Sequence, residues 1–300
     1  MFYGMFRMWP KHVESFFTKL TEGANIRDLF KRNKEAGVGR GFCEPICILA
    51  CLILYCAGRD CHVISLVMNI STSCAIRNVA EARDIVCNRR HLFVPDGISA
   101  FDTVEKRSKL AEGFNRLTFG AARGIKTMQN CIGAFDGMLL EVDRQIVVPN
   151  DRGMRNHKTT KSAVNVQACV DARRRFTMFH VDSSGSTNDA LAFSLSPLGR
   201  WLQESRPDLG DFWFIGDGGY ALDDHVMIPY RQYSCHAGVT ADQARGFNIK
   251  ASSLRSPVEC AFGIFKDKWR VFRTPLHFGY FTYCILVHSK QLQLTLVGGI

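Results

Sequence analysis

The sequence lacks a long apolar segment. Its longest apolar run, Ile46–Ala57, covers about twelve residues, whereas a membrane-spanning helix needs roughly twenty. We therefore expect a buried helix here and no membrane span. Residues Met1–Pro10 also lack a cationic stretch followed by a long apolar run, so we expect no secretory signal. Both absences favour a protein that stays inside the cell.

The sequence also lacks the paired spacings that structural zinc sites use. It contains 12 cysteines and 9 histidines, but none forms a Cys-x2-Cys or His-x3-His pair. The cysteines are too dilute for a disulfide scaffold, and Cys43, Cys47 and Cys51 recur every four residues, as on one face of a helix. We expect reduced cysteines in the core and no zinc site.

Acidic residues are fewer than basic ones, and the net charge is +10. Residues 1–126 contain 19 basic and 12 acidic residues, which gives a net charge of +7. Residues 127–300 contain 19 basic and 16 acidic residues, which gives a net charge of +3. This excess indicates a polyanionic partner, of which nucleic acid is the commonest. A solvated basic surface would give the same count, so charge alone does not decide the function.

The first part of the chain has apolar residues at helical spacing. We predict that residues 1–125 form a helical region. Within it, a helix ending near Gly58, a shorter helix at Asp60–Met68 and a third at about Ser73–Arg89 follow the order of a helix-turn-helix module. A plain helical bundle is the alternative.

The third of these helices would carry the DNA contacts of such a module. We expect four of its residues to face the core, namely Ile76, Val79, Ala80 and Val86. We expect four others to lie near solvent, where they could bind DNA, namely Arg77, Asn78, Arg83 and Arg90.

The second part, residues 126–300, changes to a pattern of strands. We predict four strands, at Cys131–Val142, Ala163–Val170, Arg175–Val181 and Phe212–Ile215, and a helix at Asn188–Glu204 between the last two. A last helix should run from about Ser256 to Arg270, because Pro257 is tolerated only in the first turn of a helix. The pattern predicts an α/β domain after the helical one.

Three acidic residues stand in apolar surroundings. Asp136 lies within the first strand, Asp217 follows the strand at Phe212–Ile215, and Glu259 falls near the start of the last helix. A buried carboxylate is costly unless a cation compensates it. Three converging carboxylates would suit Mg²⁺ or Mn²⁺, and two such ions can break phosphodiester bonds. Taken singly, the aspartates could instead be turn residues beside glycine, and Glu259 could stabilise a helix N-terminus.

The residues around these acids resemble those of a known family. The stretches that carry the resemblance are Cys131–Gly137, Asn165–Gln167, Gly185–Asp189, Gly216–Tyr220, Pro229–Tyr230, Phe247–Asn248 and Arg255–Lys266. In this order, over roughly residues 128–290, they are similar to the DDE nuclease domain of the Harbinger-type (PIF/Harbinger) transposases. Met138 and Pro257 depart from the family's usual pattern, although neither change removes an acid.

The resemblance implies that residues 126–300 form a DDE endonuclease domain with an RNase H-like fold, an α/β mixed sheet flanked by helices. This domain follows the helix-turn-helix-like region. It implies that Asp136, Asp217 and Glu259 are the catalytic acids that hold Mg²⁺ or Mn²⁺. Asp189 would be a fourth metal contributor, unless it only stabilises the start of a helix. The expected DNA contacts are Arg77, Arg83, Arg155, Lys158, Arg255 and Lys266.

Two functions follow from the resemblance. The first is metal-dependent hydrolysis of DNA phosphodiester bonds by a transposase-like nuclease in the nucleus, after synthesis in the cytoplasm. The second is a domesticated, catalytically inactive DNA-binding protein derived from a transposase. Intact Asp136, Asp217 and Glu259 favour the first. A separate DNA-binding partner protein and a homo-oligomer are both compatible with the resemblance.

Overall fold

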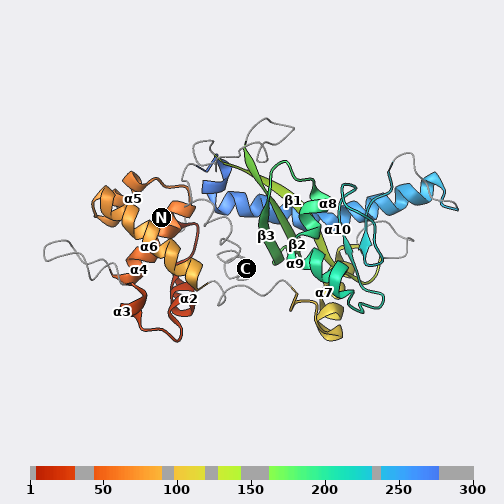
Figure 1. The fold of residues 1–300 in the computed structure, drawn as a ribbon, viewed down its shortest axis with the longest axis horizontal. Helices are drawn as coiled ribbons and strands as arrows, with labels where there is room; N and C mark the ends of the chain where they lie inside the picture. The colour runs from red at the N-terminus through yellow and green to blue at the C-terminus, as the bar shows by residue number, and fades with distance from the viewer. Residues whose placement is uncertain are drawn as a thin grey trace. The chain divides into compact units, whose positions relative to one another are not determined.

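The computed structural model describes residues 5–30, 44–89, 98–118, 128–142, 162–231 and 238–276 (Figure 1). Its contacts divide the chain into two compact units, one of Met1–Val94 with Phe265–Ile300 and one of Pro95–Ile264. The domain division at residues 125 and 126 stays a prediction. The two units are described in turn.

The first unit is helical, as predicted. It contains helices α2 (Pro10–Thr21), α3 (Ile26–Leu29), α4 (Pro45–Cys56), α5 (Cys61–Met68) and α6 (Thr72–Asn88), and also the 3₁₀ turn η6 (Arg270–Arg273). Most of α4 is buried, which confirms the predicted buried helix. The described cysteines are all free, and Cys51 and Cys56 of this helix lie in the core. Cys43 lies outside the described residues.

Helices α5 and α6 have the geometry of a helix-turn-helix pair. The chain turns by 101° between them, within the range of roughly 90–120° that is typical of this motif. Asn69 makes the turn in the left-handed conformation, with φ 52°, and the Ser71 hydroxyl accepts a hydrogen bond from the Cys74 N–H at 3.2 Å to cap α6. Among the described residues, no single helix is long and apolar enough to cross a membrane.

Two of the predicted positions on α6 were wrong, and Ala80, also expected in the core, is only half-buried. Ile76 was expected in the core but is 50% exposed, whereas Asn78 was expected near solvent but is buried. The buried residues of α6 include Ala75, Asn78 and Ala82, and the Asn78 amide lies 3.7 Å from the Cys51 sulfur of α4, on which α6 packs. The predicted burial of Val79 and Val86 is confirmed. Arg90 lies outside the described residues.

The second unit is built on a mixed sheet. Its strands are β1 (Cys131–Glu141), β2 (Ala163–Val170), β3 (Phe176–Ser184), β4 (Trp213–Ile215) and β5 (Val226–Met227), in the order β3-β2-β1-β4-β5. The pairs β3–β2 and β2–β1 are antiparallel, and the pairs β1–β4 and β4–β5 are parallel. With its flanking helices, this sheet confirms the predicted RNase H-like arrangement.

Helices cover the sheet on both sides. They are α7 (Val104–Thr118), α8 (Asp189–Ser194), α9 (Pro197–Arg200), which runs into the π-helical turn η5 (Trp201–Ser205), and α10 (Ala241–Lys268). Figure 1 shows α10 passing behind the strands and α8 and α9 lying in front of them. The core on the α8 side includes Phe101, Ile132, Phe135, Phe193 and Phe214. Ring contacts, such as Phe135 stacked on Phe193 at 4.2 Å, hold α8 against β1.

Two predicted helices have different bounds. The helix expected at Asn188–Glu204 is broken, because Ser196 caps a new helix and Pro197 has no N–H to continue α8. The last helix begins at Ala241, well before the predicted Ser256, so Pro257 lies inside it. A proline inside a helix removes one backbone hydrogen bond. Here the buried side chains of Leu254 and Val258 keep α10 packed on both sides of that position.

Candidate functional site

Parallel pairing of β1 with β4 brings two aspartates to the same end of the sheet. Ala134 of β1 is the partner of Ile215 of β4, and Asp136 and Asp217 each follow two residues later. Because the strands run in the same direction, equal steps along them end side by side. Asp217 comes just after its strand has ended, and its Oδ1 accepts the Gly219 N–H at 2.7 Å.

Asp136 is a carboxylate within a central strand. Its side chain is only 18% exposed, and its Oδ1 accepts the Gly137 N–H at 2.8 Å. Burial raises the pKa of Asp136 to about 6, against the lowering effect of the Gly137 N–H and of Arg255, and the negative charges of Asp217 and Asp189 raise it further. Its ionised form is therefore less favoured than that of an ordinary aspartate, and added positive charge would favour it.

Asp189 joins the two aspartates from the first turn of α8. Its Oδ1 accepts a hydrogen bond from the Asn165 amide at 3.1 Å. Gly137 makes this position accessible, because a Cβ atom on residue 137 would lie 2.5 Å from the Asp189 Oδ1. A glycine at this point lets the Asp189 carboxylate rest directly on β1, beside Asp136.

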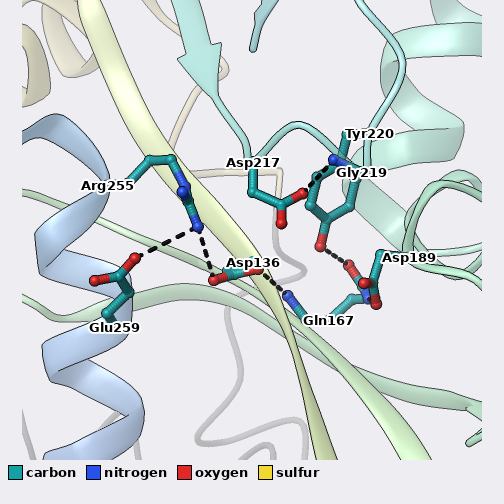
Figure 2. A network of polar contacts seen from close by, with 9 residues as sticks. Asp136, Gln167, Asp189, Asp217, Gly219, Tyr220, Arg255 and Glu259 are labelled. Carbon is teal, nitrogen blue, oxygen red and sulfur yellow. Dashed lines mark hydrogen bonds and ion pairs between the residues drawn. The ribbon is translucent and has the colours of Figure 1, made fainter. Parts of the chain in front are cut away.

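Glu259 reaches the site from α10, and Arg255, one turn earlier, lies between it and Asp136. The Arg255 Nη2 atom is 3.3 Å from the Asp136 Oδ2 and 3.4 Å from the Glu259 Oε1. Figure 2 shows the guanidinium between the two carboxylates, with Asp217 on the other side of Asp136. The structure thus brings all four predicted acids to one site, with Glu259 joined to the aspartates through an arginine.

The chemistry of these donors fits a hard divalent cation. The site offers carboxylate oxygens, which Mg²⁺ and Mn²⁺ prefer. The pKa of Asp136 is raised first by burial and then by the charges of Asp217 and Asp189, and a bound cation would lower it. In this arrangement, no three acidic, histidine or cysteine side chains within the described ranges lie close enough together to hold one ion. Arg255 supplies the positive charge between Asp136 and Glu259 instead.

A buried chain of hydrogen bonds supports the site from β2. The Tyr220 hydroxyl donates to the Gln167 Oε1 at 2.9 Å, the Gln167 amide donates to the Asn165 Oδ1 at 2.8 Å, and the Asn165 amide donates to Asp189. Tyr220, Gln167 and Asn165 are all buried. Such a satisfied network restricts its members to one arrangement.

None of these three residues was predicted to have a role in the site. A signal was present, because β2 is buried along its whole length and yet contains Asn165 and Gln167. Polar side chains in a fully buried strand must find hydrogen-bond partners. The pattern did not indicate that the partners would be Asp189 and Tyr220.

The predicted DNA contacts lie in several places. Arg77 is exposed on α6. Arg83 is only 17% exposed, and its Nε donates to the Asp84 Oδ1 at 2.7 Å. Lys266 is half-buried near the end of α10, and Arg255 contacts the two acids described above. Arg155 and Lys158 lie outside the described residues.

Comparison with known proteins gives one match. A family model described as DDE superfamily endonuclease matches residues 135–289, slightly more than half of the 300 residues. The match includes Asp136, Asp189, Asp217 and Glu259. No curated protein and no solved structure matches the chain.

Replacing Asp136 by asparagine should stabilise the metal-free protein at pH 8. The pKa of Asp136 is raised from 3.8 to about 6, so the folded state holds this proton more tightly than the unfolded state does. Stability associated with this group is therefore highest below pH 4 and is lost as the pH rises through 6. The shift corresponds to at most about 3 kcal/mol, and loss of the Arg255 ion pair will offset part of the gain.

The measurement is thermal unfolding in EDTA at pH 8 and pH 4. We expect Asp136→Asn to raise the midpoint at pH 8 and to lose this advantage at pH 4. The control is Asp211→Asn, which changes an exposed carboxylate and should leave the midpoint unchanged at both pH values. A lower midpoint for Asp136→Asn at pH 8 would contradict the raised pKa.

The Tyr220–Gln167 hydrogen bond should couple the two residues energetically. Tyr220→Phe keeps the ring that packs against Phe135 but leaves the Gln167 Oε1 without its donor, at a cost of about 1–2 kcal/mol. In a double-mutant cycle with Gln167→Leu, measured by urea denaturation, the double variant should lose less stability than the two single variants together. Additive losses would show that the bond contributes nothing.

Proposed function

We propose that this chain, which belongs to the DDE superfamily endonucleases, is a divalent-metal-dependent nuclease that hydrolyses DNA phosphodiester bonds. The observation that carries the proposal is the convergence of four carboxylates from separate elements, with a half-buried aspartate among them whose pKa is raised to about 6. Clustered, partly buried carboxylates are costly for stability. A metal site would explain why the carboxylates are present despite this cost.

The residues of the site have distinct parts in this chemistry. Asp136, Asp217 and Glu259 would hold Mg²⁺ or Mn²⁺, with Asp189 as a fourth contributor. The bound ions would activate the attacking water or hydroxyl and stabilise the leaving oxygen. The N–H groups of Gly137 and Gly219 orient the two aspartates, and the hydrogen-bond network on β2 keeps Asp189 in place.

A groove that contains two arginines supports DNA as the substrate. Its volume is about 730 Å³, and its lining includes Arg231, Arg245, Asn248, Ser252 and Ser253. Asn248 forms two hydrogen bonds with the backbone of Tyr230, at 2.8 and 2.9 Å, and so ties the segment that carries Arg231 to α10. The Arg231 Nη2 lies 3.5 Å from the carbonyl oxygen of Gly218, next to Asp217. Phosphates of a DNA strand would find two arginines along this groove.

The finer assignment is a Harbinger-type transposase-derived nuclease. Its support is the order of the motifs around the four acids, within the matched residues 135–289. With it we propose a nuclear location, where the DNA substrate is found, and action as a homo-oligomer or with a separate DNA-binding partner protein.

A second candidate function is a DNA-binding protein that no longer cuts. The observation that favours it is the position of Arg255, whose guanidinium contacts both Asp136 and Glu259 where a nuclease would hold a cation. Both candidates keep DNA binding. They differ in whether purified protein cleaves DNA when metal is supplied.

Asp217→Asn should abolish metal-dependent cleavage without unfolding the protein. Asparagine keeps the oxygen that accepts the Gly219 N–H but loses the charge, so we expect nicking of supercoiled plasmid in Mg²⁺ or Mn²⁺ to fall by about 100-fold or more. Asp211→Asn, which changes an exposed acid just before β4, should cut like the unmodified protein. EDTA should stop all cleavage.

Equal nicking by Asp217→Asn and the unmodified protein would show that the site is wrongly assigned. If neither cuts although both bind DNA, the non-cutting candidate replaces the nuclease.

The helix-turn-helix pair gives a separate prediction for DNA binding. Arg77 is exposed on α6, whereas Arg83 on the same helix is held by Asp84. Loss of one phosphate contact should weaken binding by about threefold to tenfold. It should also reduce the steepness with which the logarithm of the binding constant falls with the logarithm of the salt concentration, by about one unit. We therefore expect Arg77→Ala in the full chain to weaken binding to duplex DNA in this way, measured by fluorescence anisotropy at several salt concentrations. Arg83→Ala is the matched control, with a smaller effect. Unchanged affinity and salt slope for Arg77→Ala would assign α6 a purely structural role.

A further inference from the structure

The four carboxylates of the site have one cationic partner in the part of the chain that the structure describes. Arg255 is ion-paired with Asp136 and Glu259, and no other basic side chain there is ion-paired with Asp136, Asp189, Asp217 or Glu259. Without Arg255, Asp136 and Glu259 would face each other as like charges in a partly buried site. The arginine therefore holds together the two elements, β1 and α10, that carry these acids.

The contacts of Arg255 are weaker than those of a well-formed buried ion pair. One nitrogen, Nη2, makes both contacts, at 3.3 and 3.4 Å, whereas charge-assisted hydrogen bonds usually measure about 2.7–2.9 Å. The Nε atom is buried and has no hydrogen-bond partner. Arginine binds carboxylates most strongly when two of its N–H groups engage one carboxylate side by side, and here that arrangement is absent.

One of the two acids is free to change partner. The Glu259 side chain is 60% exposed, so it can rotate without disturbing the core, whereas the Asp136 side chain is 18% exposed and is fixed by the Gly137 N–H. A divalent cation carries twice the charge of a guanidinium and binds carboxylate oxygens directly. It would replace the Arg255 contacts at both acids.

We propose that Arg255 is a built-in counter-cation, a positioning residue that holds Asp136 and Glu259 together in the metal-free protein and is displaced from them when a divalent ion binds. This proposal rests on the proposed metal site. It assigns to Arg255 two opposite effects, since the arginine stabilises the metal-free fold and competes with the metal for the same oxygens. A residue that only binds DNA, or only packs, would not combine these two effects.

Mn²⁺ binding to the full-length protein without DNA tests the proposal. Isothermal titration calorimetry gives the dissociation constant, and thermal unfolding in EDTA gives the stability of the metal-free form. Arg255→Gln should lower the unfolding midpoint in EDTA, yet it should bind Mn²⁺ about threefold to thirtyfold more tightly, because no ion pair has to be broken. Arg200→Gln, at an exposed position on α9, is the control and should change neither value.

Arg255→Lys is the second variant, and it keeps the proposal testable if Arg255→Gln does not fold. Lysine retains the charge as a single ammonium group, so its Mn²⁺ affinity should lie above that of the unmodified protein and below that of Arg255→Gln. Equal or weaker Mn²⁺ binding by both variants would overturn the counter-cation role while leaving the metal site intact. Absence of Mn²⁺ binding by every protein, the unmodified one included, would overturn the proposed function and this role with it.

Discussion

The parallel pairing of β1 with β4 is the constraint on which the site depends. It places Asp136 and Asp217 at equal distances beyond the partners Ala134 and Ile215, so a shift of one residue in this register would turn one of the two side chains to the other face of the sheet. The other two acids are then brought to this point by packing. Phe193 stacks on Phe135 and holds α8 with Asp189, while the buried Leu254 and Val258 hold α10 with Glu259.

Charge crowding opposes this packing, and the structure reduces its cost in two ways. Backbone N–H groups and the amide of Asn165 donate hydrogen bonds to the aspartates, and Arg255 supplies positive charge between Asp136 and Glu259. Neither removes the cost entirely, since burial still raises the pKa of Asp136 to about 6. The site is thus held by the rest of the fold rather than by its own interactions, as is common where residues are arranged for function.

Much of the fold could be predicted because its strands and helices carry strong local patterns. The apolar runs predicted β1, β2 and β4 nearly to the residue, and the helical spacing of the apolar residues predicted the helices of the first unit. The start of α10 could not be predicted, because its first half is polar and Pro257 locally favours a helix start. Only packing overrides that preference. The position of Arg255 between Asp136 and Glu259 could not be predicted either, because 119 residues separate Arg255 from Asp136 and no local sequence pattern indicates such a contact.

The costly features of the site favour a nuclease over a protein that only binds DNA. A binding protein gains nothing from a half-buried carboxylate in β1, because an asparagine at residue 136 could fill the same space and accept the Gly137 N–H without the charge. Asp136 is nevertheless present, and with it a glycine at residue 137 that admits Asp189 and a buried network on β2 that orients it. A site that binds divalent cations would require carboxylates that are charged and close, and these features are the ones on which the proposed nuclease function rests.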